Sequence, residues 1–162
     1  MYIAGELQYA PSVEQNERGM AMRDDQWLRG KLDKVWSEFF SDVPKTDKVI
    51  IHFSKKCRNR LGSIRLVNST FSEIKINGFL KAPDIPEFVC EAVVAHELTH
   101  YVHGFGSSRP QLYKYPHRGG IVAREMIRRG LGETHYAAKD WINANWIDYY
   151  NSQKQGQSSE DE

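Results

Sequence analysis

The chain has 162 residues, of which 40% are hydrophobic and 27% are charged, and its formal net charge at pH 7 is +1. That size is enough for one well-packed soluble domain and too small for two full ones. The two cysteines, Cys57 and Cys90, are too few for a disulfide framework or a four-thiolate zinc ribbon, and no run of eighteen apolar residues indicates a membrane span. We therefore expect a cytoplasmic monomer without a membrane partner, a location that is compatible with association with a nucleoid or a nucleus.

The two ends of the chain lack periodic apolar residues. Residues 1–22 mix Gly, Pro, Ser, Gln and Glu, and residues 152–162 are polar apart from one glycine. Segments of this kind bury too little apolar surface to offset the entropy of ordering. The sequence therefore predicts a mobile N-terminal segment (1–22), a folded domain over 23–151 and a disordered polar tail (152–162).

The first predicted element is an amphipathic helix from about Asp24 to Ser41. Apolar side chains recur in this segment at intervals of three and four residues. They are Trp27, Leu28, Leu32, Val35, Trp36, Phe39 and Phe40. This spacing places them on one stripe of the helix, which must pack against another element.

Three short runs that favour β-structure follow, at residues 49–54, 62–67 and 73–77. The connections between them are short, which favours antiparallel neighbours over crossovers. We expect a small, mainly antiparallel three-stranded sheet. Residues 44–82 carry nine Lys and Arg against two acidic residues, whereas residues 1–42 carry five against eight, so the solvated face of the sheet should be basic.

The second half of the domain is predicted to be helical, which makes the fold class α+β. Asp84 and Glu87 have the spacing of a capping box and mark the start of a helix that should run to Gly104. Its body is apolar on nearly all sides, which in a soluble protein indicates a buried central helix. The remaining segments are a long loop and two more helices, at residues 104–116, about 120–129 and 135–150.

The predicted central helix contains the motif His96-Glu97-Leu98-Thr99-His100, in which catalytic side chains interrupt an apolar segment. Residues four apart lie one turn apart on the same helix face, so His96 and His100 can both direct a ring nitrogen at one Zn²⁺. Glu97 lies beside them, where its carboxylate can act as general base toward a water molecule at the metal. The spacing predicts one catalytic zinc ion per chain.

A catalytic zinc site needs a third protein ligand and one open position. The candidates are His103, His117, Glu125, Glu133 and His135. His103 lies too far along an intact helix to share an ion with His96. His117 follows the long loop, from which the chain can fold back over the metal, so it is the leading candidate, and Glu125 is the second.

With these residues in view, the chain resembles the SprT-like zinc metallopeptidases, a zincin-like family whose Spartan-related members degrade proteins crosslinked to DNA. The resemblance covers residues 25–132 or so. It is carried by Trp36-Ser37-Glu38-Phe39-Phe40, the basic turn 55–63, the strand Ile74-Lys75-Ile76-Asn77, the motif helix and Pro116-His117. It implies that His96, His100 and His117 bind zinc and that Glu97 is the catalytic base.

The sequence departs from this family directly after the third histidine, where Arg118-Gly119-Gly120 replaces a glycine followed by an aromatic residue. The chain also resembles the ImmA/IrrE-like peptidases, which use a similar His-Glu-Leu-x-His helix but take a glutamate from the following helix as third ligand. In that arrangement Glu125 would hold the metal. The order of helix, basic strands and Pro-His favours the SprT-like family.

Substrate and partner contacts are expected on two sides of the cleft. Candidate donors to the substrate or to a developing oxyanion lie in or beside the long loop. They are Tyr113, Tyr115, His103 and Arg109. Candidate nucleic-acid contacts lie in the basic turn and the strand after it. They are Lys55, Lys56, Arg58, Arg60 and Arg65.

The expected activity is that of a zinc endopeptidase that hydrolyses protein or peptide substrates. DNA-associated or DNA-crosslinked proteins are the candidate substrates, single-stranded DNA is a candidate partner, and DNA repair is the process this would serve. Two alternatives stay open at this stage. One is a site-specific regulatory peptidase of the ImmA/IrrE-like kind, and the other is a non-catalytic, zinc-stabilised module that binds nucleic acid or protein.

Overall fold

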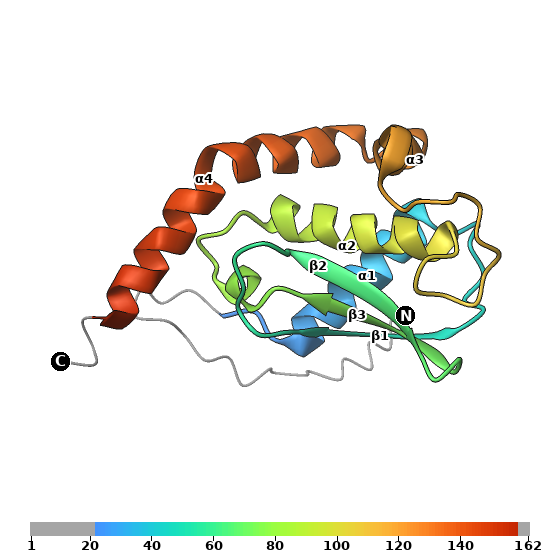
Figure 1. Cartoon of the computed structure of the whole chain (residues 1–162), viewed down its shortest axis with the longest axis horizontal. Helices are drawn as coiled ribbons and strands as arrows, with labels where there is room; N and C mark the ends of the chain where they lie inside the picture. Colours follow the sequence, from blue (N-terminus) through green and yellow to red (C-terminus); the bar gives the residue numbers. More distant parts are fainter. Residues whose placement is uncertain (1–21, 159–162) are drawn as a thin grey trace, which may run out of the picture.

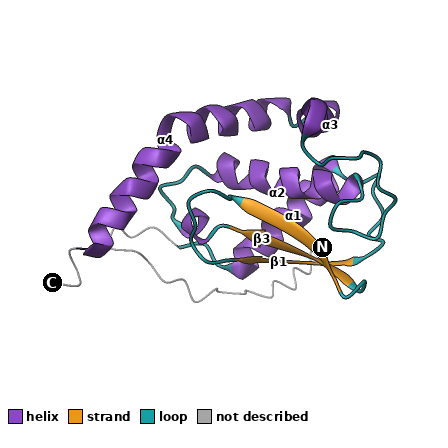
Figure 2. Cartoon of the chain, in the orientation of Figure 1, coloured by secondary structure: helices purple, strands orange, loops and turns teal. Residues whose placement is uncertain are grey.

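The computed structural model describes residues 22–158 and has an α+β fold (Figures 1 and 2). The α+β class predicted from the sequence is confirmed. The described elements are α1 (Asp25–Phe39), β1 (Lys48–Phe53), β2 (Gly62–Val67), β3 (Phe71–Ile76), α2 (Glu87–Val102), α3 (Ile121–Arg128) and α4 (Gly132–Ser158), with two short 3₁₀ helices, η1 (Gly78–Lys81) and η2 (Arg118–Gly120). All but the last residue of the predicted mobile segment, and residues 159–162 of the predicted tail, lie outside the described residues.

The three strands form a mixed sheet in the order β1-β3-β2. β2 and β3 are antiparallel, but β1 pairs with β3 in parallel, so the prediction of a mainly antiparallel sheet was wrong for one of the two pairings. The error comes from assuming that a short connection joins neighbouring strands. Residues 54–61 need to cross only the width of one intervening strand, about 10 Å at the usual strand separation. As a result, β2 is an edge strand.

Helix α1 uses its apolar stripe to cover the core. The side chain of Asp24 caps the helix by accepting a hydrogen bond of 2.8 Å from the backbone N–H of Trp27. Leu28, Leu32, Val35 and Trp36 are buried along the stripe. The ring of Trp36 meets that of Tyr101 edge-on, with centroids 5.3 Å apart, which joins α1 to α2.

Helix α2 lies at the centre of the described fold, between the sheet and α4 (Figure 1). Twelve of its sixteen residues are buried, as the apolar sequence of this segment predicts. Its N-cap is Pro86, and no side chain caps the helix, so the predicted capping box of Asp84 and Glu87 does not form. A helix buried along this length holds its polar side chains in fixed positions, because the surrounding packing restricts their rotamers.

Helix α4 extends beyond the predicted end at Tyr150 and includes residues 152–158, so the prediction of a disordered tail was wrong for these residues. Two features account for the longer helix. The ring of Phe79 meets those of Trp146 and Tyr149 edge-on at centroid separations of 5.7 and 6.1 Å, which anchors the helix. Beyond that anchor, the helix can continue over exposed polar residues that have no proline among them. Among residues 22–158, no helix has the length and apolar character needed to cross a membrane.

Candidate metal centre

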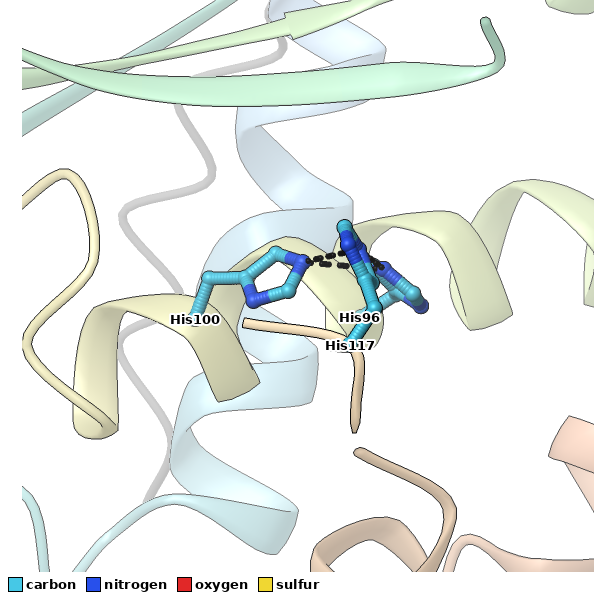
Figure 3. Close-up of side chains that lie close together, drawn as sticks. All are labelled: His96, His100 and His117. Carbon is cyan, nitrogen blue, oxygen red and sulfur yellow. Dashed lines mark hydrogen bonds between the residues drawn. The ribbon is translucent and has the colours of Figure 1, made fainter. Parts of the chain in front are cut away.

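Three histidine side chains converge on one point (Figure 3). His96 and His100 come from successive turns of α2, and His117 comes from the end of the loop that precedes α3. The Nε2 atom of His100 lies 3.0 Å from Nε2 of His96 and 3.0 Å from Nε2 of His117, and the third separation is 3.3 Å. Nitrogen ligands about 2.0–2.1 Å from a tetrahedral Zn²⁺ lie about 3.3–3.4 Å apart, so this arrangement is close to that of three zinc ligands.

The chemistry of the three rings also fits a bound cation. Each ring nitrogen of a neutral imidazole either donates or accepts a hydrogen bond, so three converging Nε2 atoms cannot satisfy one another at the same time. Burial, helped by the neighbouring histidines, lowers the pKa of His96 to about 4 and that of His100 to about 3. Both side chains are therefore neutral at pH 7, which is the form of histidine that binds metal.

The chain turns sharply directly after His117. Gly119 and Gly120 follow it with φ of 72° and 66°, a left-handed conformation that favours glycine. The two glycines bring the chain from His117 into α3. The departure from the SprT-like pattern at residues 118–120 thus has a local role, since it forms the turn that follows the third histidine.

The loop before His117 is tied to the body of the protein at several points. The hydroxyl of Ser107 donates to the carbonyl of Tyr101, and the hydroxyl of Ser72 on β3 donates to the carbonyl of Gly106, both at 2.8 Å. Ser108 donates both its N–H and its hydroxyl to the carboxylate of Asp47. These bonds fix the first half of the loop between α2 and η2. The second half of the same loop leads to His117.

Glu97 lies beside the histidines and is not one of the three converging groups. Its side chain is buried, with only 4% of the residue exposed. Burial raises the pKa of Glu97 to about 8, although the positive charge of Arg60 opposes the shift. The first residue of β2, Gly62, lies against it: a Cβ atom there would stand 2.8 Å from Oε1 of Glu97. In the metal-free protein this carboxyl therefore holds a proton at pH 7 more readily than an exposed glutamate does.

A cavity of about 470 Å³ opens beside His96, Glu97 and His117. Its apolar lining comes from the turn before β2, from α2 and from the first half of α4. These side chains are Leu61, Ala92, Val93, Ala138 and Ile142. Besides His96 and His117, the basic residues that line it are Arg60, His135 and Lys139.

Sequence reasoning missed this contribution of α4. The signal was nevertheless present, because His135, Ala138, Lys139 and Ile142 are spaced at i, i+3, i+4 and i+7 and so share one helix face. What the sequence does not reveal is that this face turns toward the motif helix.

The other candidate ligands do not join the histidine group. Glu125, the alternative third ligand, is paired at its Oε1 atom with Arg128 (2.7 Å) and with Arg129 (3.0 Å). Burial alone would raise the pKa of Glu125, but these two arginines lower it below its ordinary value. Glu125 is thus committed to an ion-pair cluster. His135 lines the cavity. Glu133 is exposed and does not line the cavity.

The four predicted donors to substrate or oxyanion are not among the residues that line the cavity. His103 is buried, and its ring meets that of Tyr113 edge-on at 4.8 Å. Tyr115 is exposed, and its ring centroid lies 5.4 Å from Nζ of Lys114 and 4.2 Å from Cζ of Arg118. Arg109 is partly buried, and its Nε has no hydrogen-bond partner among the described residues. Among the predicted donors and the predicted nucleic-acid contacts, Arg60 is the residue that lines the cavity.

The predicted nucleic-acid contacts fall into two groups. Lys55, Lys56, Arg58 and Arg60 lie together on the exposed turn between β1 and β2. Lys56 and Arg58 lie 5.2 and 5.8 Å from the ring centroids of Phe79 and Tyr150. Arg65 is separate, because its charge on β2 is paired with Glu73 at 2.7 Å.

Residues 109–130 form a second basic stretch, with six Lys and Arg against one acidic residue, and this stretch does not join the basic turn. Figure 1 places the turn at one end of α2 and α3 at the other. Arg129 is additionally paired with Asp42 at 2.7 Å, so part of the charge in this stretch is balanced. The two stretches therefore do not form one continuous basic surface.

Comparison with known proteins found no protein-family model, no curated protein and no solved structure that matches this chain.

Proposed function

We propose that the protein is a zinc-dependent endopeptidase with a zincin-like catalytic domain of the SprT-like kind. The observation that supports this most directly is the convergence of His96, His100 and His117 beside a buried glutamate that lines a cavity. Three histidine ligands leave one position of a tetrahedral zinc ion open, as catalysis requires and as structural zinc sites do not.

In this proposal the three histidines hold Zn²⁺ through their Nε2 atoms. Zinc, when bound, polarises the scissile carbonyl and lowers the pKa of water. Glu97 takes the proton of the attacking water and later donates it to the leaving amine. The apolar surroundings of Glu97, which raise its pKa to about 8, help it to hold the proton before the transfer to the leaving amine, and the positive charge of a bound zinc ion would favour the ionised form that accepts the proton of water.

The ImmA/IrrE-like alternative is less well supported, because it needs Glu125 as third ligand. Moving that carboxylate to a metal would break its pairs with Arg128 and Arg129, and it would leave the guanidinium of Arg129, which is 5% exposed, without Glu125. A regulatory peptidase that uses His117 in place of Glu125 would differ from our proposal only in its substrate.

Action on DNA-associated proteins is a narrower form of the same proposal. It is supported by the exposed turn that carries Lys55, Lys56, Arg58 and Arg60, which lies beside aromatic rings of η1 and α4. Such a surface can contact phosphates, and the half-buried ring of Tyr150 offers a face on which an unpaired base can stack, whereas Phe79 is buried. Binding of a fluorescent single-stranded oligonucleotide should weaken with rising salt and with the Lys56→Gln and Arg58→Gln substitutions. Unchanged affinity in the double variant would remove this turn as the contact.

The test of the endopeptidase proposal combines metal content with proteolysis. Purified protein should hold about one zinc per chain and should cleave casein, histone or itself, with or without single-stranded DNA. Glu97→Gln should retain the metal and lose about 10²- to 10⁴-fold in cleavage rate. Glu133→Gln, at an exposed position on α4, is the matched control and should cleave at the wild-type rate.

Two results would contradict the proposal. A Glu97→Gln variant that still cleaves would exclude Glu97 as the base. A wild-type protein that binds zinc, unfolds on chelation and cleaves none of these substrates would instead indicate the non-catalytic, zinc-stabilised binding module.

A further inference from the structure

We propose that the cavity beside Glu97 is a specificity pocket for an acidic substrate side chain, with glutamate preferred. The proposal rests on the proposed peptidase function, because it assigns the cavity to a residue next to the scissile bond. It concerns the substrate of that same site and adds two residues, Arg60 and Lys139, as determinants of specificity.

The position of the cavity makes it accessible to a substrate residue near the reacting bond. Its lining includes two of the three converging histidines and the glutamate that acts as base. A peptide whose scissile carbonyl lies at this centre therefore has a neighbouring side chain within reach of the cavity. Its volume of about 470 Å³ lies within the range of about 300–1,000 Å³ that is usual for ligand sites.

The charges around the cavity favour an anion. Arg60 comes from the turn before β2 and Lys139 from α4, so cations approach from two separate elements. The one acidic residue in the lining is Glu97, which is already assigned to proton transfer. Burial and the charge of Lys139 lower the pKa of His135, so that ring is neutral at pH 7 and adds no charge.

The apolar part of the lining favours a long side chain. Leu61, Ala138 and Ile142 offer a surface on which methylene groups can pack, while both cations are exposed to solvent. Glutamate fits both the apolar surface and the two cations, because its two methylenes can pack on the first and its carboxylate can reach the second. Lysine would place a third positive charge beside Arg60 and Lys139, and glutamine would lose the ionic attraction.

The expected preference is modest, because both cations are exposed. Ion pairs at such sites change binding by up to about five-fold each. We therefore expect glutamate to bind roughly five- to ten-fold more tightly than glutamine, and lysine to bind more weakly than glutamine.

The test uses three peptide hydroxamates that differ only in having glutamate, glutamine or lysine next to the hydroxamate. Their affinities for zinc-loaded protein are measured by calorimetry at two salt concentrations. Wild-type protein should prefer glutamate, and the preference should fall at high salt. It should disappear in the Arg60→Gln, Lys139→Gln double variant. Lys55→Gln, in the same turn as Arg60 but outside the cavity lining, should retain it.

The outcomes separate this proposal from the endopeptidase proposal. Equal affinities in wild-type protein, or a glutamate preference that survives in the double variant, would overturn the pocket even if proteins are cleaved. A glutamate preference that depends on both cations supports the pocket even if no cleavage is detected, since binding needs no turnover. If a single-stranded oligonucleotide displaces the glutamate hydroxamate and binds the double variant more weakly, the two cations serve a nucleic acid and the pocket assignment fails.

Discussion

Ser108 donates two hydrogen bonds to the carboxylate of Asp47, from its backbone N–H to Oδ2 at 2.8 Å and from its hydroxyl to Oδ1 at 2.5 Å. Asp47 is 7% exposed and precedes β1, whereas Ser108 belongs to the loop that leads to His117. The pair thus connects two segments 61 residues apart in the sequence. Its effect is to hold the loop that carries the third histidine.

The Asp47→Ala substitution should therefore weaken zinc binding as well as folding. Loss of a buried, charged hydrogen-bond acceptor should lower the free energy of unfolding of the metal-free protein by about 1–3 kcal/mol. Looser positioning of His117 should weaken zinc affinity by about ten-fold, as for residues that orient metal ligands. Competition with a chelating dye measures the second effect. Asp33→Ala, an exposed position on α1, is the control, and equal zinc affinity in the two variants would show that the pair does not position His117.

The choice of third ligand is tested by comparing His117→Ala with Glu125→Gln. If His117 completes the site, its loss should weaken zinc binding by at least about a hundred-fold, because two ligands on one helix remain. Glu125→Gln should leave zinc affinity unchanged and instead lower stability, since Glu125 pairs with the 5% exposed side chain of Arg129. The reverse pattern of affinities, measured by the same dye competition, would favour the ImmA/IrrE-like arrangement.

The sequence allowed the centre of the site to be predicted because its determinants are local. The spacing of His96 and His100 on one helix, and the apolar residues around them, depend only on helix geometry. His117 was harder to identify, since its approach depends on the anchored loop and on the turn at Gly119 and Gly120. The local sequence favours that histidine over Glu125 only through the loop that precedes it, and the pairing of Glu125 with Arg129 becomes visible only in three dimensions.

Features that depend on contacts between distant segments were predicted less well. The order of strands is an example, because the parallel pairing of β1 with β3 is determined by packing and leaves no period in the sequence. The extent of α4 is another, since polar residues after Tyr150 are compatible with either a helix or a tail. The cavity could not be predicted either, because it forms only where α4 lies along α2.

Gly62 is close enough to the motif helix for a methyl group to disturb the candidate base. A Cβ atom at this position would lie 2.7 Å from Cγ1 of Val93 and 2.8 Å from Oε1 of Glu97. Gly62→Ala should therefore cost about 1–3 kcal/mol in stability and should slow cleavage by displacing Glu97, while zinc affinity stays unchanged.

The matched control for this substitution is Gly30→Ala, because a Cβ atom there meets nothing within 4 Å. Gly30 lies within α1, so alanine should be neutral or should stabilise the protein by up to about 1 kcal/mol. Denaturant unfolding and cleavage rates distinguish the two variants. A Gly62→Ala protein as stable and as active as wild type would show that β2 does not restrict Glu97.

On the side of the sheet away from Ile74, Glu73 joins the three strands through its carboxylate. Its Oε2 atom lies 3.1 Å from Nε2 of His52 on β1, and its Oε1 atom accepts a hydrogen bond of 2.7 Å from Nε of Arg65 on β2. Lys75, on β3 with Glu73, lies 3.7 Å from Oε1. The hydrogen bonds from His52 and Arg65 hold the pKa of Glu73 below its ordinary value of 4.5.

This lowered pKa predicts a pH dependence of stability. The ionised carboxylate stabilises the fold fully above pH 4.5, where Glu73 is charged in both the folded and the unfolded chain. As the pH falls below 4.5, the unfolded chain binds the proton first, so this contribution is lost as the pH approaches the lower pKa of the folded state.

Glu73→Gln should therefore lower the free energy of unfolding at pH 7 by about 1 kcal/mol, and the difference from wild type should shrink toward pH 3. Glu38→Gln, an exposed position on α1, should show no such convergence, and a Glu73→Gln difference that stays constant with pH would mean that the carboxylate's charge is not what joins the strands.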